Sequence, residues 1–368
     1  MDYAASAKPN PSSIHEFGVN AKKKLEYARK DVARVLGARP EEIIFTSGGT
    51  ESNNLAIQGI IFMVREKNTL PHIVTTNIEH PSVLETCKLL EKRKLAEVSI
   101  IAVESNGIVD PRKIKKVIKS NTVLVSVIYA NNEIGTIQPI REIAKEIRHF
   151  KKNNTGSNIV FHTDAVQAVN YLELNVEKLG VDLLTLSGSK IKGAGRVGVL
   201  YKKFGLNIEN IFGGGDQEGG LRPGTENLEE IFKFSSAFKK VGSIKEKESK
   251  RLVLLRDYFF KKLEKLGFII NGDTQNRLPN NVNVTFQKIP SDLLVVELSA
   301  HGVMTSSKSA CKSSSSEGSY VIRALRPDAD PEIGGLRFSL GYDTKKEDID
   351  YTIKSLTQIL TKLKKWYN

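Results

Sequence analysis

The order of apolar and polar residues predicts strands alternating with helices through the first two thirds of the chain. Short runs rich in β-branched residues are typical of buried strands, and they fall at 42–46, 72–76, 97–103, 122–129, 158–162, 181–186 and 199–201. Apolar residues at helical spacing occupy the stretches between them at 13–36, 55–64, 81–93, 111–119 and 139–150. Such alternation indicates an α/β fold, with a mostly parallel sheet covered by helices on both faces.

The pattern changes near residue 240. The stretch before it, 212–230, is rich in glycine and proline and has too little apolar surface for a core, so we predict a connecting loop. A lysine-rich amphipathic helix, two strand signals and two further helices follow at 245–265, 267–270, 281–286, 291–300 and 346–364. A chain of 368 residues suits about two domains. We therefore predict a large domain at 14–240 and a smaller α+β domain at 241–368, which also includes the N-terminal segment 1–13.

The formal net charge of +13 raises the question of nucleic-acid binding. The lysines lie mainly on amphipathic segments and are mixed with acidic residues, as at 239–251, which is typical of solvated helix faces. No zinc-ligand spacing or aromatic RNA-binding motif accompanies them. An acidic protein partner or simple solubility explains the charge better than a nucleic acid does.

The sequence predicts neither a membrane span nor a metal site. No apolar run approaches the roughly 20 residues that a membrane-spanning helix needs, and the chain starts at Met1 without the regions of a signal peptide. We therefore expect a cytoplasmic protein. The two cysteines, Cys87 and Cys311, lie far apart in sequence, give no metal-ligand spacing, and argue against a disulfide framework.

Polar and reactive side chains follow the predicted strands at the point where each strand ends. They are Glu79 and His80 after 72–76, Asn132 after 122–129, Asp164 and Gln167 after 158–162, and Ser187, Ser189 and Lys190 after 181–186. Ligands of such sheets bind beyond the carboxyl ends of the strands. Each residue alone has an ordinary explanation: Lys190 as a solvated surface group, His80 as a structural one, Asp164 as a helix cap. Together they predict an active site, in which a desolvated Lys190 could act as an amine nucleophile.

Two other stretches carry candidate chemistry. The turn at 47–54, which includes Gly49 and Thr50, joins a predicted strand to a predicted helix and presents backbone N–H groups to an anion such as phosphate, although plain helix capping gives the same pattern. Cys311 lies between Lys308 and Lys312 in a serine-rich segment. Nearby cations lower the pKa of a thiol, so we predict a reactive thiolate there.

Nine ordered segments carry a resemblance to a known family. They are 10-NPSSIH-15, 46-TSGGTESNN-54, 79-EHPSV-83, 131-NNEIGTIQP-139, 162-HTDAVQAV-169, 187-SGSK-190, 222-RPGTEN-227, 309-SAC-311 and 337-RFSLG-341. On these motifs the chain resembles the cysteine desulfurases of the class V aminotransferase family, in the branch that serves nitrogenase maturation and iron–sulfur cluster assembly. The resemblance covers essentially the full length. It implies a fold-type-I enzyme that depends on pyridoxal 5'-phosphate (PLP), normally a homodimer with sites at the subunit interface.

The resemblance also implies roles for individual residues. Lys190 would be the Schiff-base lysine, Asp164 the partner of the pyridinium nitrogen, and His80 a group that stacks on the ring and shuttles protons. The other implied assignments are Gln167 and Asn132 at the ring oxygen, Gly49, Thr50 and Ser187 at the phosphate together with Thr225 of the other subunit, Ser189 as a further cofactor contact, Arg337 and Asn132 at the substrate, and Cys311 as the sulfur acceptor.

The implied reaction converts L-cysteine to L-alanine. The thiolate of Cys311 takes the sulfur as a persulfide, and a carrier or scaffold protein then accepts it. The alternatives are a selenocysteine lyase or another class V PLP-dependent aminotransferase or lyase that would not use Cys311. A more remote alternative is a non-catalytic basic binding protein that retains the fold.

Three positions depart from the family pattern. Ser189 stands where the family usually has histidine, so we predict weaker cofactor retention by about 1 kcal/mol, the difference between a neutral and a charge-assisted hydrogen bond. The segment between Ala5 and Asn10 is shorter than usual. Lys308 stands where a glycine is expected, and we hypothesise that it helps to lower the pKa of the Cys311 thiol.

Overall fold

A computed structural model describes residues 9–64, 69–307, 318–328, 330 and 333–367. The chain divides into two compact units. The first comprises Met1–Ile101, Pro111–Tyr129 and Pro139–Ile244, and the second comprises Ala102–Asp110, Ala130–Gln138 and Lys245–Asn368. The boundary predicted at 240 falls close to the last of these divisions. Residues 9–13, however, belong to the first unit, whereas the sequence placed the N-terminal segment with the smaller domain.

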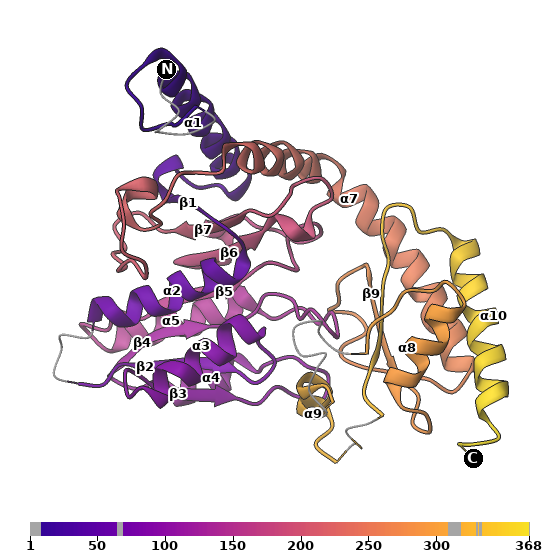
Figure 1. The fold of residues 1–368 in the computed structure, drawn as a ribbon. Helices are drawn as coiled ribbons and strands as arrows, with labels where there is room; N and C mark the ends of the chain where they lie inside the picture. Colours follow the sequence, from indigo (N-terminus) through magenta and orange to yellow (C-terminus); the bar gives the residue numbers. More distant parts are fainter. Residues whose placement is uncertain (1–8, 65–68, 308–317, 329, 331–332, 368) are drawn as a thin grey trace. The chain divides into compact units, whose positions relative to one another are not determined.

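Within the described part of the first unit, seven strands form one sheet (Figure 1). In spatial order they are β1 (Ile43–Thr46), β7 (Gly198–Lys202), β6 (Leu183–Ser187), β5 (Val160–Asp164), β4 (Thr122–Ser126), β2 (His72–Thr76) and β3 (Glu97–Ile101). From β6 to β3 every neighbouring pair is parallel, and β7 runs antiparallel to both β1 and β6. The predicted α/β fold with a mostly parallel sheet is confirmed.

The helices of the first unit cover this sheet. They are α1 (Glu16–Leu36), α2 (Gly49–Val64), α3 (Pro81–Lys92), α4 (Pro111–Val117), α5 (Ile140–Asn153), the short α6 (Val176–Leu179) and the first part of α7. α2 packs on β4, β5, β6 and β7 and lies beside α3. Ile57 and Ile61 of α2 share a fully buried core with Leu124, Leu183 and Leu200 of the strands. Burial of this kind explains why the strands read as continuous apolar runs.

The second unit is built around a smaller sheet. Among its described residues, three antiparallel strands lie in the order β10 (Leu336–Ser339), β9 (Asn281–Thr285) and β8 (Ile269–Ile270). Its helices are α8 (Ser291–Ala300), α9 (Tyr320–Leu325), α10 (Lys346–Leu363) and the last part of α7. Phe259 of α7 packs edge to face on Phe338 of β10, with ring centroids 4.9 Å apart.

α7 (Leu228–Lys265) is one helix of 38 residues that belongs to both units. The prediction of a loop through residue 230 and a helix from 245 was wrong at this point. Ile231, Phe234 and Phe238 continue the apolar helical spacing upstream, and all three are buried. Like every other helix in the described ranges, α7 lacks the apolar length that crossing a membrane requires.

Candidate active site

The candidate residues of the first unit lie at the carboxyl ends of its strands. Asp164 is the last residue of β5 and Ser187 is the last of β6. Lys190 ends the single 3₁₀ turn that follows β6, and His80 is the N-cap residue of α3, just after β2. Because β2, β5 and β6 point the same way in one sheet, these residues share one edge of it.

The carboxylate of Asp164 is buried and held from two sides. The residue is 3% exposed. Its Oδ1 accepts a hydrogen bond from the backbone N–H of Val166 at 3.0 Å, and its Oδ2 accepts one from Asn53 Nδ2 of α2 at 2.8 Å. A buried carboxylate in a fixed orientation is suited to pair with a cationic ring nitrogen.

His80 lies within electrostatic reach of both Asp164 and Lys190. Burial lowers the pKa of its imidazole, the charge of Asp164 raises it, and the charge of Lys190 lowers it. The net direction is downward, so the imidazole is neutral at neutral pH. The first unit therefore brings Lys190, Asp164 and His80 together.

The turn between β1 and α2 forms a cradle for an anion. α2 begins at Gly49, and the first N–H groups of a helix have no intrahelical acceptor. A Cβ at Gly49 would lie 2.9 Å from Val166 Cγ2 and 3.4 Å from Ser187 Cβ, so glycine permits the close approach of this turn to the ends of β5 and β6. Ser187 Oγ lies 3.0 Å from the hydroxyl of Ser189, and Thr50 is the second residue of α2. Hydroxyl groups and free backbone donors thus surround one place.

The glycine-rich loop at 212–227 is tied to this turn by an ion pair. Arg222 Nε donates to Glu51 Oε1 at 2.9 Å, and Glu51 Oε2 accepts from the backbone N–H of Ser47 at 2.8 Å. Burial raises the pKa of Glu51, but the bonds from Arg222 and Ser47 outweigh it and the pKa is lowered. The loop also carries Thr225, which is exposed.

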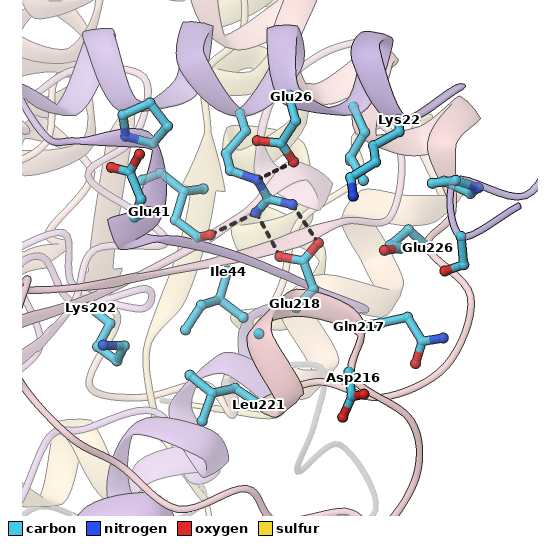
Figure 2. Close-up of a pocket in the computed structure, with 17 residues that line it drawn as sticks. Lys22, Glu26, Glu41, Ile44, Lys202, Asp216, Gln217, Glu218, Leu221 and Glu226 are labelled. Atoms are coloured by element: carbon cyan, nitrogen blue, oxygen red, sulfur yellow. Dashed lines mark hydrogen bonds and ion pairs between the residues drawn. The ribbon is translucent and has the colours of Figure 1, made fainter. Parts of the chain in front are cut away.

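A second attachment of the same loop borders a cavity of about 720 Å³ (Figure 2). Glu218 makes a bidentate ion pair with Arg29 of α1, at 2.7 and 2.8 Å, and Glu26 contacts the same guanidinium; dashed lines in Figure 2 mark these pairs. The residues that line the cavity come from the segment before α1, from α1, the β1 region, β7 and the loop, and they do not include Lys190 or Asp164. The cavity is therefore separate from the candidate active site.

The second unit brings together two residues predicted to contact the substrate. Arg337 Nη1 donates to the backbone oxygen of Asn132 at 2.9 Å. Burial lowers the pKa of Arg337, and the charge of Glu133 partly opposes this. Asn132 Oδ1 is buried and has no hydrogen-bond partner within the described part of the chain. Buried amide oxygens are normally paired, so this atom is suited to receive a ligand.

Of the remaining predicted residues, the structure describes Gln167 alone. Cys311 and its neighbours Lys308 and Lys312 lie outside the described residues. Gln167 is half-buried in the turn after Asp164. In the ranges that the structure describes, no group of three histidine, cysteine, aspartate or glutamate side chains could hold a metal ion.

Comparison with known proteins identifies the family. The family model described as aminotransferase class-V matches residues 1–352. The chain belongs to the class-V aminotransferases. The predicted family and fold type are confirmed, and enzymes of this family depend on PLP.

Similar class-V proteins include curated cysteine desulfurases. The "Cysteine desulfurase IscS" of Dictyoglomus turgidum is 43% identical over 357 residues, which are 96% of this chain and 88% of that protein. The protein of the same name from Methanosarcina thermophila is 42% identical over 365 residues, 99% of this chain and 88% of its own. A solved "NIFS-LIKE PROTEIN" superposes with a TM-score of 0.88 at 34% identity, over 96% of this chain and 92% of that one. A structure described as "SspA in complex with cysteine" gives 0.77 at 31%, over 92% of each chain.

The sequence did not single out four residues that support the candidate active site or the loop at 212–227. Asn53 and Ser82 contact the predicted residues Asp164 and His80, and Glu51 and Glu218 anchor the loop. Three of them lie inside motifs that the sequence analysis used, Glu51 and Asn53 in 46–54 and Ser82 in 79–83. The motifs could therefore have pointed to these residues. The motifs alone do not show which distant residues these side chains contact.

Proposed function

We propose that this protein is a PLP-dependent cysteine desulfurase, which converts L-cysteine to L-alanine and transfers the sulfur to its own Cys311. The observation that carries the proposal is the grouping of Lys190, Asp164 and His80 at one edge of the sheet. Curated relatives at 43% and 42% identity have this activity in their names. The predicted function agrees with these comparisons.

The residues of the first unit fit the cofactor. Asp164 presents a fixed, buried carboxylate to a ring nitrogen, and the first backbone N–H groups of α2, which begins at Gly49, are donors suited to a phosphate. The groups that would hold the phosphate are Gly49, Thr50 and Ser187, with Ser189 nearby and Thr225 contributed by a second subunit. Gln167 would bond the ring oxygen, a task that the family assignment also gives to Asn132. Bound PLP supplies an electron sink for the substrate Cα.

Each reacting residue then has a defined task. Lys190 would hold the cofactor covalently and move the proton at the substrate Cα, and His80 would hold or move a second proton. Arg337 would bind the substrate carboxylate with its planar guanidinium, beside Asn132. The Cys311 thiolate would attack the substrate sulfur. The carbon–sulfur bond of the substrate would break, its electron pair would stay on Cβ, and Cβ would take up a proton to give alanine. Cys311 would retain the sulfur as a persulfide.

The partners of the enzyme are part of the same proposal. We propose a homodimer, because the exposed Thr225 has no cofactor task within its own subunit under the family assignment. A carrier or scaffold protein would accept the persulfide sulfur. The cytoplasmic location remains a prediction from the sequence.

The test compares the full chain with two variants, Lys190→Ala and Cys311→Ala, supplied with PLP and L-cysteine. We expect visible cofactor absorbance and alanine formation from the unaltered chain. Lys190→Ala should lower alanine formation by about 10²- to 10⁴-fold, and Cys311→Ala should abolish protein-bound persulfide while retaining the absorbance. Persulfide-independent alanine formation at the full rate in Cys311→Ala would instead favour a lyase that does not use Cys311. A colourless protein that releases no alanine would refute the proposal.

A further inference from the structure

A chain of hydrogen bonds joins the two predicted cofactor residues, Asp164 and His80, through two residues with no assigned role. Asn53 Nδ2 donates to Asp164 Oδ2 and to Ser82 Oγ, both at 2.8 Å. Ser82 Oγ lies 2.7 Å from His80 Nδ1. Asn53 and Ser82 are 1% and 8% exposed. Water therefore does not compete for these bonds.

The chemistry of the end groups fixes the direction of every bond. An ionised carboxylate only accepts, so the amide group of Asn53 that faces Asp164 must be the NH₂ group. At the other end, the backbone N–H of Ser82 donates to His80 Nδ1 at 3.1 Å, so Nδ1 carries no proton. The hydroxyl of Ser82 must then donate to Nδ1 and accept from Asn53.

The orientation of the Asn53 amide leaves one of its own atoms without a hydrogen bond. Its Oδ1 is buried and has no hydrogen-bond partner among the described residues. Leaving such an oxygen unpaired is unfavourable. The reverse orientation would place that oxygen against the Asp164 carboxylate, where two acceptors repel. The negative charge of Asp164 therefore fixes the orientation of the Asn53 amide. The amide in turn fixes the direction of the hydrogen bond between the Ser82 hydroxyl and His80.

We propose, on the basis of the proposed function, that Asn53 and Ser82 are positioning residues that hold His80 as the neutral tautomer with its proton on Nε2, in an orientation set by Asp164. His80 then presents a donor N–H at Nε2, and protonation at Nδ1 requires loss of the bond from the Ser82 backbone N–H and reversal of the bond with the Ser82 hydroxyl. The charged groups that face the imidazole are Asp164 of β5 and Lys190 after β6. We call the hydrogen-bonded series Asp164–Asn53–Ser82–His80 the relay. Asp164 therefore acts on His80 both through its electric field and through the relay, whereas Lys190 acts through its field.

The first test needs no variant. The full chain is labelled with ¹⁵N-histidine, and the His80 signal is identified among those of the six histidines by its loss in His80→Gln. At neutral pH, without PLP, we expect Nδ1 to have the chemical shift of an unprotonated nitrogen and Nε2 that of a protonated one. A proton on Nδ1 would overturn the proposal.

The second test separates positioning from a general packing role. Ser82→Ala removes one bond to the neutral form of His80, so the protonation constant of His80 should rise about three- to tenfold, and Ser82→Thr, which keeps the hydroxyl, should restore it. Asn53→Ala should give a smaller rise, and none when Ser82 is already alanine. The matched control is Ser52→Ala, which removes the hydroxyl that bonds Thr46 at 2.7 Å on the same helix and leaves the relay intact. Equal His80 titration in Ser82→Ala and Ser52→Ala would contradict the proposal.

These outcomes are independent of the desulfurase assay. Both measurements are made on the chain without cofactor or cysteine. A protein that forms no alanine but shows the Nε2–H tautomer would support the relay and refute the proposed function. An active desulfurase with His80 protonated on Nδ1 would support the proposed function and refute the relay.

Discussion

Ser189 directly precedes Lys190 in the sequence. Its hydroxyl lies 3.0 Å from Ser187 Oγ. A neutral hydroxyl offers a cofactor one weak donor, whereas an imidazole could offer a charged one. We predict that Ser189→His tightens PLP binding by about 1 kcal/mol, or about fivefold in Kd. Titration of the visible absorbance measures this. Ser189→Ala should weaken binding in the same assay, and a histidine variant that binds no tighter than the unaltered chain contradicts the prediction.

Glu79 gives a pH-dependent prediction. It is completely buried and accepts hydrogen bonds from Thr76 Oγ1 at 2.6 Å and from the backbone N–H of Ile128 at 2.8 Å. Burial raises the pKa of Glu79, those two bonds lower it, the charge of Asp164 raises it, and the net result is a pKa of about 8. The folded protein therefore keeps a proton that the unfolded chain releases from its ordinary pKa of about 4.3 upward, so stability falls as the pH rises through this window and the loss is complete above about 8.

Glu79→Gln removes this ionisation at nearly constant size. Relative to the unaltered chain, the variant should gain stability with rising pH between about 4.3 and 8, by up to roughly 5 kcal/mol. Urea unfolding at several pH values measures the difference. Glu85→Gln on the exposed side of α3 is the control and should show no such trend. A constant difference between Glu79→Gln and the unaltered chain would show that Glu79 is ionised in the fold.

At the residue scale, the sequence predicted a candidate site but not its electrostatics. Glu79, His80, Asp164 and Lys190 were all predicted from their places after strands. The protonation of Glu79 and the tautomer of His80 depend on burial and on contacts with β4, β5 and α2, which are distant in the chain. Spacing along a sequence carries no information about those contacts.

Among the elements, the loop at 212–227 is more than the connector that its composition predicted. Glu218 has a left-handed backbone conformation, with φ of 50°, and its side chain is 1% exposed. Besides Arg29, it accepts a hydrogen bond from the backbone N–H of Phe45 at 2.8 Å. A non-glycine residue in this conformation persists where its surroundings hold it. Glu218 therefore anchors the loop that carries Thr225 to α1 and β1.

Glu218→Gln should destabilise the protein by about 3–5 kcal/mol, because it removes the buried counter-charge of Arg29 and leaves the guanidinium paired with the partly exposed Glu26. The double variant with Arg29→Met should recover part of this loss. Chemical unfolding measures both, and limited proteolysis should cut the loop faster in Glu218→Gln. Asp31→Asn, on the more exposed side of α1, should cost less than about 1 kcal/mol. Equal costs for Glu218→Gln and Asp31→Asn would show that Glu218 is no anchor.

Strands were easier to predict than the long helix. β1 to β7 begin within about two residues of their predicted starts because apolar β-branched runs mark them locally. α7 was predicted only from 245, since the preceding glycines and the polar residues near Leu228 obscure its start. The helix there depends on burial of its apolar face against the first unit.

At the scale of the whole molecule, the two units are interleaved in sequence. Segments 102–110 and 130–138 leave the first unit and join the second, although both lie inside the predicted large domain. The second segment supplies internal partners: the backbone oxygen of Glu133 accepts from Asn281 Nδ2 at 2.9 Å and from Asn283 Nδ2 at 3.0 Å, and Leu278 N–H donates to the oxygen of Gly135 at 2.9 Å. Residue-by-residue patterns cannot predict such an exchange, because each segment looks like an ordinary strand connection.

This exchange predicts that the C-terminal fragment 245–368 does not fold alone. Without 130–138, the side chains of Asn281 and Asn283, which are 5% and 2% exposed in the chain, lose their shared acceptor. Unpaired buried polar groups cost about 1–3 kcal/mol each, a large share of a small unit's stability. We expect the fragment to show no cooperative thermal transition by circular dichroism and poor dispersion in its NMR spectrum. Addition of a peptide spanning 130–138 should increase its ordered structure, whereas a peptide of the same composition in scrambled order should not. A fragment that unfolds cooperatively by itself would mean that the strand β9 needs no partner from the earlier part of the chain.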